Sequence, residues 1–209
     1  MKKLLMTVTI LVMALGLTLS PALVRADALL DFGTGSAGNG GLITLLSGPN
    51  ATGAGIPLGV LTATLGGGPA VVYNLSNTVL AFDTRTATNF ITIIGGVPGL
   101  TIPDGTLLMN GTFSNFSITG PGGNNVLTVH GSGADVKDAG LLRELGIPLN
   151  TPFAFDGFTV TSLFNPGTNS GVATSTDIGN KAVPEPATML LLGSGLLGMG
   201  AYARRRFKK

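Results

Sequence analysis

Apolar and polar residues alternate with a period of two along much of the middle of the chain. In residues 158–164, Phe158, Val160 and Phe164 fall on one face of an extended chain, and threonines fall on the other face. Residues 126–130 repeat the pattern. A period of two is typical of a β-strand with one buried face, so both segments are predicted to be strands.

Further apolar, threonine-rich runs are separated by turn-forming residues. The runs cover residues 71–75, 78–83, 90–94 and 107–118, and the turns cover Gly66–Pro69, Gly95–Gly99 and Gly120–Asn125. Glycine supplies a positive φ at such turns and proline a fixed one. Short strands joined in this way predict a mostly β fold, an antiparallel β-sandwich or a jelly-roll-like domain.

One segment, residues 138–146, has helical spacing instead. Leu141, Leu142 and Leu145 recur on one helical face, and the glycine and proline of Gly146-Ile147-Pro148 end the pattern. We therefore expect one short helix of two turns, lying across an edge or an end of the sheet.

The N-terminus has the three regions of a secretory signal peptide. Met1–Lys3 is basic, Leu4–Leu19 is apolar, and a polar region follows. Small residues precede the junction after Ala26, so signal peptidase is expected to cut there, with Ala28 as a second candidate site. The mature chain then begins at Asp27.

The C-terminus carries a second apolar run in a fixed order of parts. The tripeptide Pro184, Glu185, Pro186 comes first, an uncharged run at 187–203 follows, and a basic tail at 204–209 ends the chain. Seventeen residues form a helix of about 25 Å, close to the roughly 30 Å of a bilayer core. A transmembrane helix is predicted. Its basic cluster, Arg204, Arg205 and Arg206, holds the C-terminus inside and leaves the preceding domain outside.

This order of parts resembles the PEP-CTERM sorting signal of bacterial surface proteins, a segment also catalogued as the ice-binding protein C-terminal domain. The resemblance implies recognition by an exosortase, a membrane-embedded cysteine transpeptidase that processes the chain near Pro184–Pro186. The alternative is a single-pass anchor that is never cut. Either reading takes the protein through the inner membrane, to remain anchored or to reach the cell surface or the extracellular matrix.

The chain thus divides into four parts. These are a signal peptide at 1–26, a β-rich exported domain at 27–164, a linker at 165–182 and the sorting signal at 183–209. The linker is predicted because the apolar rhythm ends after Phe164, and the residues that follow are rich in Gly, Ser, Thr and Asn.

Charge separates the ends of the chain from its middle. Of the 12 basic residues, only Arg85, Lys137, Arg143 and Lys181 lie between residues 27 and 182, against nine acidic residues. An acidic domain lacks the clustered basic residues that nucleic-acid binding requires, so nucleic acid is excluded as a partner. Cysteine is absent, which excludes disulfides and thiolate metal sites.

Several apparent functional motifs have simpler explanations. Gly33, Gly35 and Gly38 match a dinucleotide-binding pattern, but Asn39-Gly40-Gly41 cannot open the helix that would hold the phosphates. His130, the single histidine, lies near Ser132 and Asp135, but alternation turns it away from the apolar face and favours a surface residue over a catalytic triad.

The carboxylates do not indicate a specific metal site or catalytic site either. Asp135, Asp138 and Glu144 are the densest group, and a calcium site there competes with a simple capping role for Asp138. A glycosidase needs two carboxyl groups across a cleft, and the candidates for such a pair are Asp83 and Asp156, which follow Phe82 and Phe155 in similar triplets. The distance between these two side chains cannot be read from the sequence. We therefore predict no catalytic residues, no metal and no cofactor.

The sequence predicts where the protein goes better than what it does there. The favoured reading is a structural or adhesive component of the envelope or of the extracellular polysaccharide matrix, without enzymatic activity. One alternative is a secreted hydrolase of matrix polysaccharide, and another is a binding module for glycan, calcium or ice. A flat threonine-rich face favours ice or surface binding, and two facing carboxylates favour the hydrolase.

Overall fold

The computed structural model describes residues 28–121 and 125–183. The cleavage site at Ala26, the Pro184–Pro186 motif, the 187–203 run and the 204–209 tail lie outside these residues. Within the described part of the chain, no helix has the length and apolar character needed to cross a membrane.

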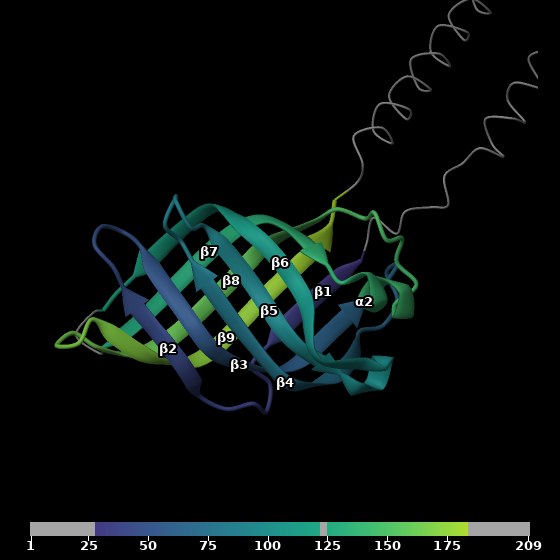
Figure 1. Cartoon of the computed structure of the whole chain (residues 1–209), viewed down its shortest axis with the longest axis horizontal. Helices are drawn as coiled ribbons and strands as arrows, with labels where there is room; N and C mark the ends of the chain where they lie inside the picture. The colour runs from purple at the N-terminus through teal and green to yellow at the C-terminus, as the bar shows by residue number, and fades with distance from the viewer. Residues whose placement is uncertain (1–27, 122–124, 184–209) are drawn as a thin grey trace, which may run out of the picture.

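The described chain is built almost entirely from β-strands (Figure 1). The elements are β1 (Leu29–Gly33), β2 (Gly40–Leu45), β3 (Ala51–Thr64), β4 (Val71–Asp83), β5 (Phe90–Val97), η1 (Pro98–Leu100), β6 (Ile102–Thr119), β7 (Val126–Lys137), α2 (Ala139–Glu144), β8 (Phe153–Asn165) and β9 (Ser170–Ala182). The runs predicted from alternation lie in β4 to β8. Strands β2, β3 and β9 were not predicted.

The sheet closes on itself. Strands β3 to β9 follow one another in chain order, each antiparallel to the next. The gap between β3 and β9 is filled by β1 and β2 together, because each pairs with both of those strands. The result is a closed antiparallel barrel with eight strand positions.

The predicted β-sandwich or jelly roll is therefore wrong. A sandwich keeps two sheets with free edges, whereas here the first strands pair with the last one and close the ring. Inward and outward side chains alternate in the same way in both architectures, so the period of two does not distinguish them. The pairing of β1 with β9 decides the fold.

The predicted linker at 165–182 is also wrong for most of its length. Residues Ser170–Ala182 form β9, which pairs with β8 along its length and with β1 and β2 on its other side. The inward residues Ala173, Thr176 and Asn180 are buried although they are small or polar. Polar composition made this wall strand resemble a linker.

The barrel has two distinct rims. At one rim, here called the tail rim, the N–H of Ala182 donates to the C=O of Ala28 at 2.9 Å, so the described chain begins and ends there. Helix α2 lies at the same rim (Figure 1). The opposite rim, here called the far rim, carries the connections at 46–50, 84–89 and 166–169.

The predicted short helix is confirmed as α2. Asp138 is its N-cap, and its carboxylate accepts from the N–H of Leu141 at 2.8 Å. Leu141 and Leu142 are buried, with Leu145 close behind them. The helix covers the tail rim with apolar side chains.

Phenylalanines fill the interior of the barrel. Phe158 packs edge-to-face against Phe82 and Phe113, with ring centroids 5.2 and 5.0 Å apart, and Phe155 joins the same cluster. Gly53 of β3 makes room for this phenylalanine cluster, because a Cβ at Gly53 would lie 2.2 Å from Cε1 of Phe82. Gly53, one of the glycines that made β3 hard to predict as a strand, is thus part of how the core is packed.

Candidate functional site

A cluster of polar side chains lies inside the barrel, between β7 and β9. Asp135 and Lys137 both point inward from β7, and their side chains are completely buried and form an ion pair. The ammonium of Lys137 also donates to Oδ1 of Asn180, on β9, at 3.0 Å. It lies 4.9 Å from the centre of the Phe153 ring. We call Asp135, Lys137 and Asn180 the core polar cluster.

The carboxamide of Asn180 is fixed from its other side. Its Nδ2 donates to the C=O of Leu30 at 3.0 Å and to the C=O of Ile178 at 2.8 Å. Asn180 itself is fully buried. Both amide hydrogens are thus used, and the carbonyl oxygen is left to face Lys137.

Burial works against both charges of the cluster. It lowers the pKa of Lys137 to about 8, in spite of the neighbouring carboxylate. It also raises the pKa of Asp135, although Lys137 opposes that shift. Oδ2 of Asp135 is buried with no hydrogen-bond partner. The environment therefore favours a neutral amine beside a protonated carboxyl more than water does.

The sequence held a signal for part of this cluster. Leu127 and Val129 face inward, and the same parity along β7 places Asp135 and Lys137 inward as well. Asn180 had no such signal, because its strand was predicted to be a linker.

The His130, Ser132 and Asp135 group does not come together. His130 points outward and is exposed, as predicted, and its Nδ1 lies 3.2 Å from Oγ1 of Thr159. Asp135 points into the barrel from the same strand. His130 and Ser132 instead line a surface hollow of about 300 Å³ together with Asn115 and Asp156.

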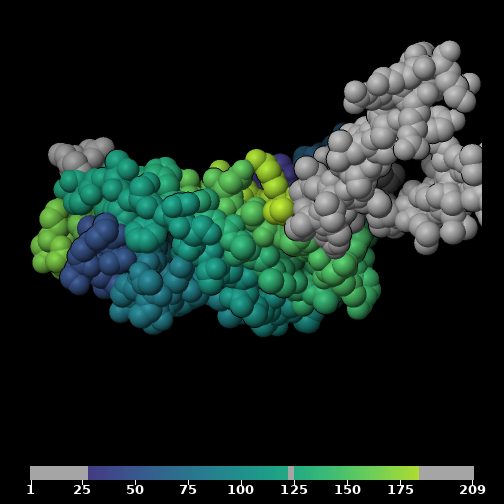
Figure 2. Space-filling model, turned by 90° about the horizontal axis from the view of Figure 1, so that it is seen from above, coloured from purple at the N-terminus to yellow at the C-terminus, as the bar shows by residue number. Residues whose placement is uncertain are grey.

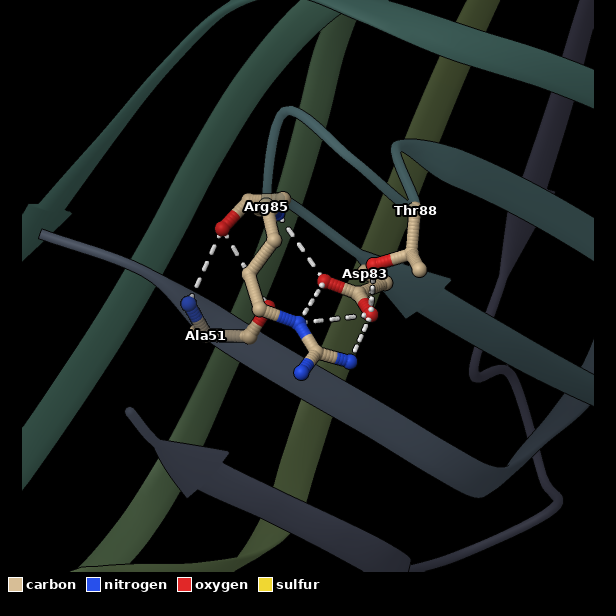
Figure 3. A network of polar contacts seen from close by, with 5 residues as sticks. Ala51, Asp83, Arg85 and Thr88 are labelled. Atoms are coloured by element: carbon tan, nitrogen blue, oxygen red, sulfur yellow. Dashed lines mark hydrogen bonds and ion pairs between the residues drawn. The ribbon is translucent and has the colours of Figure 1, made fainter. Parts of the chain in front are cut away.

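Asp83 and Asp156 do not form a facing pair of free carboxylates. Asp83 accepts from Nε of Arg85 at 3.0 Å and from Oγ1 of Thr88 at 2.6 Å, at the far rim (Figure 3). The Arg85 hydrogen bonds lower its pKa to about 2. Asp156 pairs with Lys181 on the outer wall at 2.7 Å. Asp83 is therefore part of a turn structure.

The turn that holds Asp83 is also tied to β3. Oγ1 of Thr84 accepts from the N–H of Ala51 at 2.9 Å and donates to the C=O of the same residue at 3.2 Å (Figure 3). The far rim is thus braced by side chains of the β4–β5 turn.

The proposed calcium ligands are also apart. Asp135 lies in the core, and Asp138 caps α2. Among residues 28–121 and 125–183, no group of three or more His, Cys, Asp or Glu side chains is placed to hold a metal ion. The glycine pattern at 33–38 leads from β1 into β2 and does not open a helix.

Two carboxyl groups meet on the outer wall where the barrel closes. Asp31 of β1 and Asp177 of β9 share a hydrogen bond, and burial together with that neighbour raises the pKa of Asp31 to about 6. Oδ1 of Asp31 is buried without a hydrogen-bond partner. Sequence reasoning missed the pair because it depends on the pairing of the first strand with the last.

Replacing Asp31 with asparagine is expected to stabilise the barrel at neutral pH. The pKa of Asp31 is about 6 in the folded state and near 4 in the unfolded state. Between these two pH values the folded state still holds a proton that the unfolded state has released. The stability of the fold therefore falls as the pH rises through that window. Asparagine removes this loss. Thermal unfolding at about pH 4 and about pH 8 measures it, with the larger gain for Asp31→Asn at the higher pH.

Asp156→Asn is the matched control, because Asp156 is exposed on the same wall. We expect it to leave the pH dependence unchanged. An Asp31→Asn protein with the wild-type pH dependence would show that the pair does not titrate between these pH values.

The described residues define a class of protein: a filled, closed antiparallel barrel whose chain enters and leaves at one rim. In the view from above, the last described residues, in yellow, lie at the surface of the barrel (Figure 2). Residues 182–206 match the family model of the PEP-CTERM protein-sorting motif, so the sorting signal begins where β9 ends. The chain carries an exosortase sorting signal, and this signal implies export and processing at the membrane on the way to the cell surface.

Comparison of the chain with curated proteins and with solved structures gives no match. The resemblance read from Pro184–Pro186 and the run after it is confirmed by the motif match.

Proposed function

We propose that the barrel is a structural or adhesive component of the cell surface or of the extracellular polysaccharide matrix, without enzymatic activity. The observation that carries this proposal is the filled interior together with the placement of both ends of the described chain at the tail rim. Phe82, Phe113, Phe155 and Phe158 occupy the space where a small barrel would otherwise hold a ligand. Contacts with other molecules are therefore expected at the outer wall and the far rim.

The outer wall carries an apolar row near the far rim. Leu42, Val172 and Leu163 lie opposite one another on β2, β9 and β8, and they are 51%, 48% and 61% exposed. We call these three residues the distal row. Contiguous exposed apolar side chains are typical of contact surfaces. The distal row faces the surroundings at the end of the barrel opposite the sorting signal.

A hydrolase is less well supported. Asp83 and Asp156, the carboxylates considered for it, are each held by a cation, Arg85 and Lys181. Glycosidases require two carboxyl groups facing each other across a cleft. The polar hollow around His130 and Asn115 suits weak contact with a polysaccharide and fits a matrix role.

Replacing Leu163 and Val172 together with threonine is expected to release the protein from the matrix. Threonine keeps the β-propensity and the shape of the wall, so stability should change by only about 0.5 kcal/mol, whereas lost apolar contact should lower matrix retention about threefold to tenfold. Immunoblots of cell, matrix and medium fractions measure the distribution.

The matched control lies on the opposite wall. Val79 and Ile94 pair with each other on β4 and β5 and are similarly exposed, so Val79→Thr with Ile94→Thr changes apolarity equally at another place. Wild-type retention of the distal variant, or equal loss in both variants, would contradict a contact role for the distal row.

A further inference from the structure

We propose that Lys137 and Asn180 become joined by an isopeptide bond inside the barrel, formed by the chain itself with Asp135 as the catalytic acid and base. The three residues are the whole of the core polar cluster. The bond would connect β7 to β9 across the intervening strand β8.

The reacting groups are already in contact. Nζ of Lys137 lies 3.0 Å from Oδ1 of Asn180, so the amine is beside the carbonyl that it has to attack. The carboxamide cannot turn freely, because its Nδ2 donates to the C=O groups of Leu30 and Ile178. Fixed neighbouring groups react as if they were present at very high concentration, so even a weak electrophile such as an amide can be attacked.

The environment supplies the reactive protonation state. Only the neutral amine has a lone pair, and burial lowers the pKa of Lys137 to about 8 while it raises the pKa of Asp135. Moving the proton from Nζ to Asp135 removes two charges from an apolar core, which lowers the cost of forming the nucleophile. The buried Oδ2 of Asp135 has no other partner and is available to hold that proton.

The reaction balances without any co-reactant. The lone pair of Nζ forms a bond to Cγ of Asn180. Asp135, which already holds the first proton of Nζ, gives that proton to Nδ2 and takes the second proton from Nζ. The bond between Cγ and Nδ2 breaks, ammonia leaves, and Asp135 stays protonated. The amine and the primary amide have become a secondary amide and ammonia, with no oxidation or reduction.

The bond would be well placed for a protein held by its C-terminus. Asn180 lies two residues before Ala182, the last residue of β9, and the sorting motif begins at 182. A pull on the tail peels β9 away from its neighbours, starting at this end. A covalent link at Asn180 would stop that peeling at once and transmit the load to β7.

A purely structural cluster is a poorer explanation of these residues. A buried ion pair often stabilises a core no more than apolar residues of the same size do, and the unpartnered Oδ2 of Asp135 adds a cost. In the covalent product Lys137 is part of an uncharged amide. The core then contains no buried ammonium at Lys137 and needs no carboxylate at Asp135 to balance its charge.

The test is peptide mapping of the protein purified from the surface of the producing cells. Trypsin does not cut after an acylated lysine, so we expect peptide 86–143 joined to peptide 144–181, lighter than their sum by one ammonia, about 17 Da. Separate peptides 86–137, 138–143 and 144–181 at full mass, from protein that is folded by circular dichroism, would overturn the proposal.

Variants assign the roles. Lys137→Arg keeps the charge but lacks the nucleophile, and Asp135→Asn keeps the shape but cannot carry the proton; both are expected to give no joined peptide. Lys181→Arg changes a neighbouring exposed lysine and should leave the bond intact. A complete bond in Asp135→Asn would exclude Asp135 as the catalytic residue. The wild-type map decides the main question even if a variant does not fold.

Discussion

Replacing Phe158 with alanine is expected to lower the free energy of unfolding by about 3–5 kcal/mol, because the cavity left in the core cannot collapse. Phe158 is 1% exposed and touches Phe82, Phe113 and Phe155 edge-to-face, so two strands besides its own, β4 and β6, lose contacts. The same change should lower the melting temperature by roughly 10 °C. Chemical and thermal unfolding followed by circular dichroism give both values.

Phe116→Ala is the matched control. Phe116 is only partly buried against the core, so its loss should cost clearly less than that of Phe158. Equal costs for the two variants would mean that the phenylalanine cluster does not fill the barrel as the structure shows it.

Replacing Glu185 with alanine is expected to abolish processing while export continues. The apolar run at 187–203 is unchanged, so the chain still reaches the membrane, but the Pro184–Pro186 motif that the exosortase reads is broken. The protein should accumulate uncut, heavier than the wild type by the tail that is normally removed. Immunoblots of membrane fractions and intact mass measurement report this.

Glu144→Ala controls for the loss of a glutamate, since Glu144 and Glu185 are the two glutamates of the chain and Glu144 lies on α2. It should be processed normally. Neutral residues in place of Arg204, Arg205 and Arg206 should instead weaken retention and topology. Processing of Glu185→Ala to the wild-type mass would leave a plain membrane anchor as the better explanation of the tail.

The local patterns that predicted strands succeeded where the side chains alternate clearly, as in β7 and β8. They failed for β3, which contains glycines at 53, 55 and 59 and a proline at 57, residue types that are depleted in strands. Gly53 is needed because Phe82 fills the space that its side chain would take. A residue chosen to fit a distant partner carries no local signal of its own strand.

The candidate sites follow the same division. The outward orientation of His130 and the capping role of Asp138 depend on neighbours within a few residues, and both predictions are confirmed. The core polar cluster depends on β7 and β9 lying on either side of β8, with their inward side chains meeting inside the barrel. Asp135 was weighed as a metal ligand and as a triad member, whereas its partners are Lys137 and Asn180.

The sequence by itself determined the sorting signal, most of the strands and the one short helix, because each depends on hydrophobicity, charge or period within one continuous segment. Only the tertiary structure decided that the sheet closes into a barrel, that residues 170–182 form its last wall strand and that Lys137 meets Asn180. These outcomes depend on contacts between distant segments, such as the hydrogen bond from Asn180 to Leu30, which lie 150 residues apart. Such pairings are selected by the packing of the whole core, and no single segment encodes them.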